Sequence, residues 1–277
     1  MDVVAAMTTV PALFTGLFDD AALFPPGDAP LAEAVPAHLA HRSSRYADAV
    51  GPFLCGAARI GELAALAGPD LPVGLVLPGG SAQLRAALAD AAGLTVVTVE
   101  LAAPDVPAAV AALDGLLPIG VTAAVEIPRT GRLEDHLDAL VASPHRAKYR
   151  TGGLSADAFP DEDELAAFLA GCAERGLPYK CTAGLHHAVR HTDPATGFEH
   201  HGFLNVALAA LTGERKAAAE LLAERDGTVL ADAVRGLSDH QVDYVRRFFT
   251  SFGTCSITEP LEDLHTLGLL AHPLEDR

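Results

Sequence analysis

Lysine and net positive charge are what this sequence has least of. Only three lysines stand among its 277 residues, against sixteen arginines, and the formal net charge is −17 with a pI near 4.9. Nucleic acids and anionic membrane surfaces attract proteins through a basic face, because phosphate charge dominates the attraction. The composition therefore argues against a nucleic acid or a membrane surface as the partner.

Long apolar runs and closely spaced cysteines are also missing. No apolar stretch approaches the roughly 18 to 20 residues of a membrane span, and the first residues lack the basic start of a signal peptide. Four cysteines lie far apart and form no C-x-x-C pair: Cys55, Cys172, Cys181 and Cys255. Cysteines that lie this far apart usually serve as small core residues in a protein of a reducing compartment. We therefore expect a cytoplasmic protein.

Short β-type runs alternate with helical stretches along the chain. We expect strands at 11–18, 50–56, 72–77, 94–101, 120–127, 146–151, 178–183 and 250–256. We expect helices at 31–42, 59–68, 81–92, 105–116, 132–142, 160–176 and 259–270. A closed (β/α)8 TIM-type barrel contains eight strands, each followed by a helix, and this pattern therefore predicts that fold. The length and apolar content of the chain suit the same class.

The pattern predicts one α/β domain over residues 1–277, because no internal repeat or low-complexity linker interrupts it. Extra helices and a histidine-rich loop fall between the seventh and eighth strands. An open doubly wound sheet is the alternative. No G-x-G-x-x-G follows the first strand, which removes the usual positive reason for preferring that sheet.

Two of the three lysines end predicted strands. Lys148 and Lys180 close apolar runs, whereas Lys216 lies in a polar helical stretch. A chain that uses arginine for positive charge has little structural reason to put its rare lysines there. Lysine can lose its proton and attack a carbonyl group, which arginine cannot do. The placement therefore suggests a covalent role.

Other polar side chains lie near the carboxyl ends of the same strands. Side chains alternate across a strand, so residues two apart share a face. The pairs that share a face in this way are Thr98 and Glu100, Thr122 and Glu126, Lys148 and Arg150, Lys180 and Thr182, and Thr254 and Ser256. In a barrel these strand ends form the catalytic mouth. We therefore expect Glu100, Glu126 and the two lysines to converge on one site.

Three segments carry a family resemblance: Lys148–Gly153 (KYRTGG), Gly176–Gly184 (GLPYKCTAG) and Ser251–Ile257 (SFGTCSI). Together they resemble the sixth, seventh and eighth strands of the class I deoxyribose-phosphate aldolase family, over parts of residues 146–263. The resemblance implies that Lys148 forms a Schiff base and that Lys180 lowers its pKa. It also implies that Gly253 and Ser256 lie where the family's eighth strand leads into a helix N-terminus that binds phosphate.

The residues themselves also favour imine chemistry. A second cation a few ångströms away, or burial, can lower a lysine pKa from ~10.4 by several units, and Arg150 adds to the positive charge expected there. Glu100 or Glu126 would then move protons as a general base. We expect a lyase or aldolase acting on a small anionic carbonyl compound without a cofactor, and either lysine can be the nucleophile. The alternative is a non-catalytic clamp of arginine and lysine that binds an anion.

Five histidines fall within residues 186–201, directly after the seventh predicted strand. One hypothesis makes this segment a lid over the mouth, with His187 as general acid or base. The substrate ligands would then include His186, Arg190, His191 and Thr182. The alternative is a divalent metal site for a metal-dependent lyase or hydrolase, built from His187, His191 and His200, although no H-E-x-x-H is present.

Two aspartates end the first predicted strand. Asp19 or Asp20 could join the mouth as an acid, a base or a metal ligand, but capping of a short turn is the favoured role for one of them. The sequence leaves the oligomeric state open and is compatible with a homo-oligomer.

Overall fold

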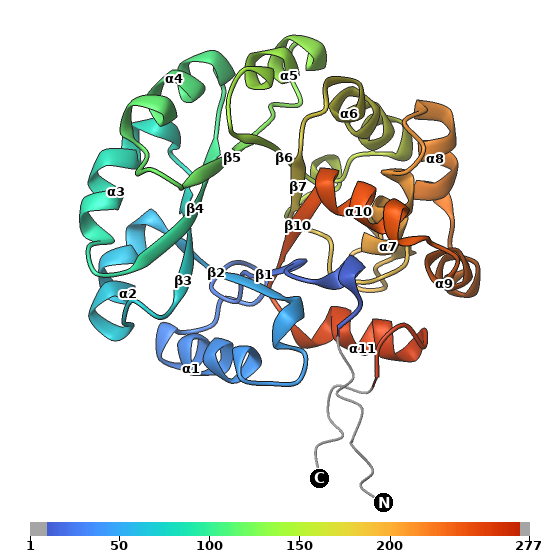
Figure 1. Cartoon of the computed structure of the whole chain (residues 1–277), viewed down its shortest axis with the longest axis horizontal. Coiled ribbons are helices and arrows are strands. Elements are labelled where there is room, and N and C mark those ends of the chain that lie inside the picture. Colours follow the sequence, from blue (N-terminus) through green and yellow to red (C-terminus); the bar gives the residue numbers. More distant parts are fainter. Residues whose placement is uncertain (1–9, 272–277) are drawn as a thin grey trace, which may run out of the picture.

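The computed structural model describes residues 10–271, which form a closed barrel of eight strands with parallel neighbours (Figure 1). Around the barrel the strands follow the order β1, β10, β7, β6, β5, β4, β3, β2. Their bounds are β1 (Phe18–Asp20), β2 (Val50–Gly56), β3 (Pro72–Leu77), β4 (Thr95–Ala102), β5 (Thr122–Glu126), β6 (Arg146–Arg150), β7 (Tyr179–Thr182) and β10 (Phe249–Thr254). The (β/α)8 barrel predicted from the sequence is therefore confirmed.

Helices surround the barrel and follow each strand (Figure 1). The helices that agree with the predicted ones are α1 (Leu31–Arg42), α2 (Ile60–Leu66), α3 (Leu84–Asp90), α4 (Val106–Leu116), α5 (Leu133–Val141), α6 (Glu162–Arg175) and α11 (Thr258–Thr266). Helix α6 shows why the ends of the helices could be predicted from the sequence. The Asp161 side chain accepts a hydrogen bond from the backbone N–H of Glu164, and Gly176 ends the helix with a φ of +64°.

The connection from β7 to β10 holds the extra elements expected from the sequence. It contains a two-stranded antiparallel hairpin followed by four helices. These elements are β8 (His191–Thr192), β9 (Glu199–His200), α7 (Phe203–Ala209), α8 (Arg215–Ala223), α9 (Gly227–Arg235) and α10 (Asp239–Phe248). The histidine-rich segment therefore includes the hairpin.

The first strand begins later than the sequence predicts. Residues 11–18 were expected to be extended, but Ala12–Phe14 form a 3-10 helix that packs against α10, and β1 starts at Phe18. An apolar run shows which residues are buried but not whether they are extended, because helix and strand can bury the same short run. The shift matters because it places Asp19 inside the strand, where its side chain direction is fixed.

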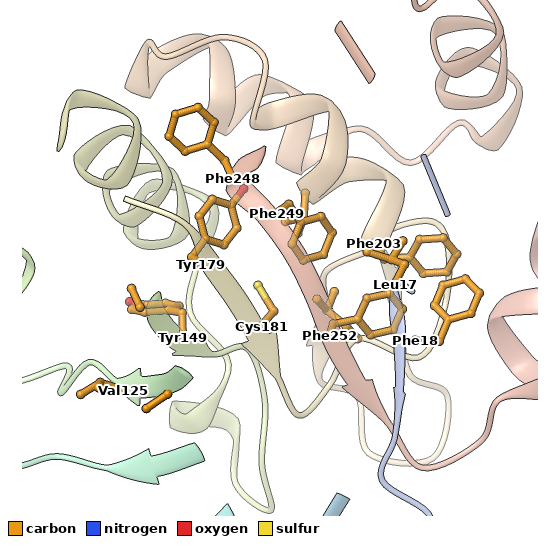
Figure 2. Packing of buried hydrophobic residues seen from close by; sticks show 14 of the residues in the cluster. Leu17, Phe18, Val125, Tyr149, Tyr179, Cys181, Phe203, Phe248, Phe249 and Phe252 are labelled. Atoms are coloured by element: carbon orange, nitrogen blue, oxygen red, sulfur yellow. The ribbon is translucent and has the colours of Figure 1, made fainter. Parts of the chain in front are cut away.

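Aromatic side chains pack the outer face of β1 and β10 against α7 (Figure 2). Phe18, Phe203 and Phe252 are fully buried, and their ring centroids lie 5.2 to 5.7 Å apart. Burying one such side chain contributes about 1.5 to 3 kcal/mol. Because Phe18 faces outward into this cluster, the next residue, Asp19, faces the barrel interior.

Candidate active site

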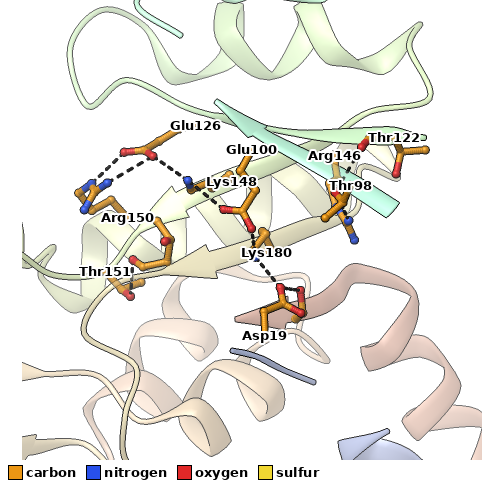
Figure 3. Close-up of polar contacts among 12 residues, drawn as sticks. Asp19, Thr98, Glu100, Thr122, Glu126, Arg146, Lys148, Arg150, Thr151 and Lys180 are labelled. Carbon is orange, nitrogen blue, oxygen red and sulfur yellow. Dashed lines mark hydrogen bonds and ion pairs between the residues drawn. The ribbon is translucent and has the colours of Figure 1, made fainter. Parts of the chain in front are cut away.

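Polar side chains occupy a large part of the barrel interior, where branched apolar residues are usual (Figure 3). Lys148 on β6 is the register partner of Lys180 on β7 and of Glu126 on β5. Tyr149, the residue between Lys148 and Arg150, points outward and stacks on Phe168 at 4.3 Å. The parity expected from the sequence therefore holds at β6, and both lysines project into the barrel.

Lys148 lies between two carboxylates. Its Nζ is 3.0 Å from Oε2 of Glu100 and 3.2 Å from Oε2 of Glu126. Glu126 also accepts a hydrogen bond from Nε of Arg150, at 2.8 Å. Lys148 and Glu100 are almost completely buried, whereas the Arg150 side chain is 44% exposed. Arg150 therefore closes the outer side of the group.

Lys180 lies between two other carboxylate oxygens. Its Nζ donates to Oδ2 of Asp19 at 2.5 Å and also to Oε1 of Glu100. Ser251 donates a further hydrogen bond to Asp19, at 2.7 Å. Lys180 is fully buried. Glu100 therefore bridges the two amines, with one oxygen on Lys148 and the other on Lys180 (Figure 3).

The charges in this group set the ionisation of its members. Burial raises the pKa of Glu100, but Lys180 and Lys148 outweigh burial and lower that pKa to about 2. Burial lowers the pKa of Lys180, but Asp19 and Glu100 outweigh burial and raise it. The pKa of Glu126 is lowered in the same way, because Lys148 and Arg150 outweigh its burial.

The surroundings of Lys180 bear on the open choice between the two lysines. Crowding of cations was expected to lower a lysine pKa, but carboxylates separate the cations and the pKa of Lys180 is raised. Lys180 therefore keeps its proton in this arrangement. Its place suits a fixed positive charge better than a nucleophile.

A second polar layer lies toward the amino ends of the strands. Arg146 shares a face with Lys148, and its Nη2 and Nη1 donate to Oγ1 of Thr98 at 2.9 Å and of Thr250 at 3.2 Å. The sequence pattern indicates Thr98 and gives Asp19 a minor role, but it does not identify Arg146, Thr250 or Ser251. The spacing of Arg146 two residues before Lys148 is the signal that could have identified it.

Two glycine-containing turns fix the rim beside the lysines. A Cβ on Gly184 would lie 2.8 Å from the backbone oxygen of Thr151, and a Cβ on Gly152 would lie 2.9 Å from the Cα of Gly184. Gly184 has a φ of +76°, and Ala183 has a φ of +60°. The turns after β6 and β7 therefore lie so close together that there is no room for a side chain at Gly152 or Gly184.

Gly51 on β2 makes room for the Asp19 carboxylate. A Cβ on Gly51 would lie 2.2 Å from Oδ1 of Asp19, whereas a Cβ on Gly61, in α2, meets nothing within 4 Å. We expect Gly51→Ala to push the carboxylate off Lys180 and to lower the free energy of unfolding by about 1 to 3 kcal/mol, as overpacking does. Gly61→Ala is the matched control and should be neutral or stabilising. Urea unfolding of both variants tests this, and equal stability of the two would contradict it.

The remaining expected substrate ligands lie at the same end of the barrel. Thr182 ends β7, and a Cβ on Gly253 in β10 would lie 3.9 Å from its Oγ1. Ser256 lies just before α11, where its hydroxyl accepts a hydrogen bond from the backbone N–H of Glu259 at 3.3 Å. The hydroxyl of Ser256 is therefore engaged by the helix, and its expected role in binding phosphate stays a prediction.

The histidine-rich segment forms a separate polar group. Nδ1 of His186 is 3.1 Å from Oε2 of Glu259, and Nδ1 of His187 is 3.1 Å from Oδ2 of Asp263, both on α11. Arg190 is buried, with its Nη2 2.7 Å from Oε1 of Glu162 in α6. These contacts bind the segment to α11 and α6. The predicted lid over the lysines and the role of His187 in catalysis stay predictions.

The three histidines of the metal hypothesis lie near one another. The ring of His191 is 4.7 Å from that of His187 and 5.1 Å from that of His200, measured between centroids. Within residues 10–271, however, no three side chains of histidine, cysteine, aspartate or glutamate are arranged to hold a metal ion. The metal alternative therefore has no assembled ligand set in this part of the chain.

The fold and this site define a (β/α)8 barrel with a buried group of two lysines and three carboxylates inside it. Comparison of the chain with protein-family models, curated proteins and solved structures found no match. The resemblance to class I deoxyribose-phosphate aldolases therefore stays a prediction. In the described part of the chain, none of the helices combines the length and apolar character needed to cross a membrane.

Proposed function

We propose that this protein is an aldolase-type lyase that binds a small anionic carbonyl compound as a Schiff base on Lys148. The proposal is carried by the buried group in which one carboxylate, Glu100, bridges Lys148 and Lys180. The raised pKa of Lys180, whose burial is outweighed by Asp19 and Glu100, makes it the fixed cation. Lys148 is then the amine left to react.

The two carboxylates around Lys148 can handle its proton. Attack on a carbonyl requires a neutral amine, and Oε2 of Glu100 and Oε2 of Glu126 are the acceptors within 3.2 Å of Nζ. An iminium ion carries the same single positive charge as the ammonium ion that it replaces. The carboxylates that hold the ammonium ion therefore also suit the iminium ion, so its formation leaves the charge balance of the buried site unchanged.

An iminium ion on Lys148 would serve as an electron sink. In a substrate with a β-hydroxyl group, a base removes the hydroxyl proton, the bond between the α and β carbons breaks, and its electron pair moves to the iminium nitrogen. Glu126 is the candidate base, because its side chain contacts Lys148 and is less enclosed than Glu100. Arg150, exposed at the rim and paired with Glu126, is the candidate ligand for the substrate anion.

The anion clamp is the second candidate function, but the contacts favour it less. Lys148 and Lys180 are buried and each contacts a carboxylate of the protein itself, so an anion would have to compete for them. The metal-dependent alternative rests on the histidine-rich segment alone. Cytoplasmic location belongs to the proposal as a prediction from the sequence. The oligomeric state stays open.

Borohydride trapping tests the proposal. The protein is incubated with a panel of small aldehydes, ketones, keto acids and sugar phosphates, reduced with borohydride, and digested for mass mapping. We expect one substrate mass on Lys148, because reduction turns the imine into a stable secondary amine. Lys216, exposed in α8, is the internal control for non-specific reaction. No adduct with any compound, or equal adducts on Lys148 and Lys216, would reject the Schiff base.

A further inference from the structure

The four cysteines divide into two groups by their surroundings. Cys55, Cys172 and Cys181 are buried, and burial raises the pKa of each thiol, to about 11 for Cys55 and about 12 for Cys181. Cys255 is partly exposed and directly follows β10, at the carboxyl ends of the barrel strands. Among the four cysteines, Cys255 is therefore the one whose thiol is most accessible to solvent.

Cys255 also has a histidine and a glutamate beside it. Its Sγ lies 3.7 Å from Nδ1 of His186, and the same nitrogen lies 3.1 Å from Oε2 of Glu259. A carboxylate only accepts hydrogen bonds, so Nδ1 carries the hydrogen and also presents it to the sulfur. Burial lowers the pKa of His186, but the hydrogen bonds with Cys255 and Glu259 raise it to about 9. The imidazole is therefore cationic at neutral pH.

We propose that Cys255 is a modification site, a nucleophilic thiol that small hydroperoxides oxidise to a sulfenic acid with His186 as its acid–base partner. Reactive cysteines characteristically stand beside a histidine and near a helix N-terminus, and α11 begins three residues after Cys255. The lysine group takes no part in the thiol chemistry. The inference therefore holds whether or not Lys148 forms an imine.

The reaction balances with the groups present and one hydroperoxide. Cys255 reacts as its thiolate, whose proton has gone to water, beside the imidazolium ion of His186. The sulfur attacks one peroxide oxygen while the O–O bond breaks. The sulfur loses two electrons and becomes a sulfenic acid, and the second oxygen takes the proton from the imidazole and leaves as water or an alcohol. Gly27 lies close to Cys255, since a Cβ there would lie 3.0 Å from the Cβ of Cys255.

The test is oxidation of the full-length protein with hydrogen peroxide in the presence of dimedone, which labels sulfenic acids, followed by mass mapping. We expect labelling of Cys255 at least about tenfold faster than that of the three buried cysteines. Exposure alone could produce that difference, so the deciding comparison uses variants. His186→Gln should slow labelling of Cys255 by about tenfold or more, since it removes the acid–base group.

His187→Gln is the matched control, because His187 is the neighbouring histidine and pairs with Asp263 instead of with the thiol. It should leave the rate at Cys255 unchanged. Absence of dimedone on Cys255 in the wild type, or an equal rate in His186→Gln, overturns the proposal. Circular dichroism verifies that the variants are folded. Should His186→Gln fail to fold, Glu259→Gln gives the same readout, with a slower rate expected and an unchanged rate again overturning the proposal.

Discussion

Lys148→Arg should abolish the borohydride adduct and lower turnover of the identified substrate by roughly 10³ to 10⁶-fold. Arginine keeps the positive charge between Glu100 and Glu126 but cannot lose a proton and attack a carbonyl. Loss of a covalent nucleophile from a catalytic group has effects of this size. The measurements are mass mapping after reduction and steady-state kinetics on the compound that traps best.

Two controls make this result interpretable. Lys216→Arg makes the same substitution at an exposed site in α8 and should leave trapping and turnover at wild-type levels. A urea unfolding curve of Lys148→Arg shows whether the larger guanidinium group has disturbed the buried site. Wild-type turnover by a folded Lys148→Arg variant would exclude the covalent role and favour an anion clamp, because arginine binds anions at least as well as lysine.

The barrel could be predicted from the sequence because the pattern of alternating strands and helices is periodic and extends along most of the chain. Most of the expected strands and helices agree with the structure to within a few residues, since apolar alternation, glycine turns and capping aspartates such as Asp161 act locally. The exception, residues 11–18, is a short apolar run that begins with Pro11 and has no alternation to distinguish a strand from a 3-10 helix. A local pattern can identify burial there but not conformation.

The candidate site was predicted only in part, for a different reason. Strand parity brought Glu100, Glu126 and the two lysines to one mouth, and the structure places them there. Strand parity predicts the direction in which a side chain points but not the residue that it contacts. Asp19 reaches Lys180 across 161 positions of sequence, and no local pattern contains that contact. The sign of the Lys180 pKa shift depends on it, so the sequence could not provide that sign.

Charge balance explains how the barrel tolerates so polar an interior. Lys148, Lys180 and Arg150 supply three positive charges, and Asp19, Glu100 and Glu126 supply three negative ones. A buried charge costs several kcal/mol unless it is paired, and hydrogen bonds such as that from Ser251 satisfy remaining oxygens. The group is therefore stable as a set, and removal of a single member is costly.

Lys180→Met should lower the free energy of unfolding by about 3 to 5 kcal/mol, because methionine fills similar space but leaves Asp19 without its cation. Glu100 loses one of its two amines in the same variant and keeps Lys148. Urea unfolding at neutral pH measures the loss. A loss below about 1 kcal/mol would mean that water or a shifted side chain replaces the pairing.

The double variant Lys180→Met with Asp19→Asn separates charge pairing from packing. Removing both charges restores the balance, so we expect the double variant to be more stable than Lys180→Met alone, with a coupling energy of about 1 to 3 kcal/mol between the two sites. Asp19→Asn alone leaves Lys180 with only Glu100 and should also destabilise. Additive effects of the two substitutions would show that Asp19 and Lys180 contribute independently, and Asp19 would then not be what raises the pKa of Lys180.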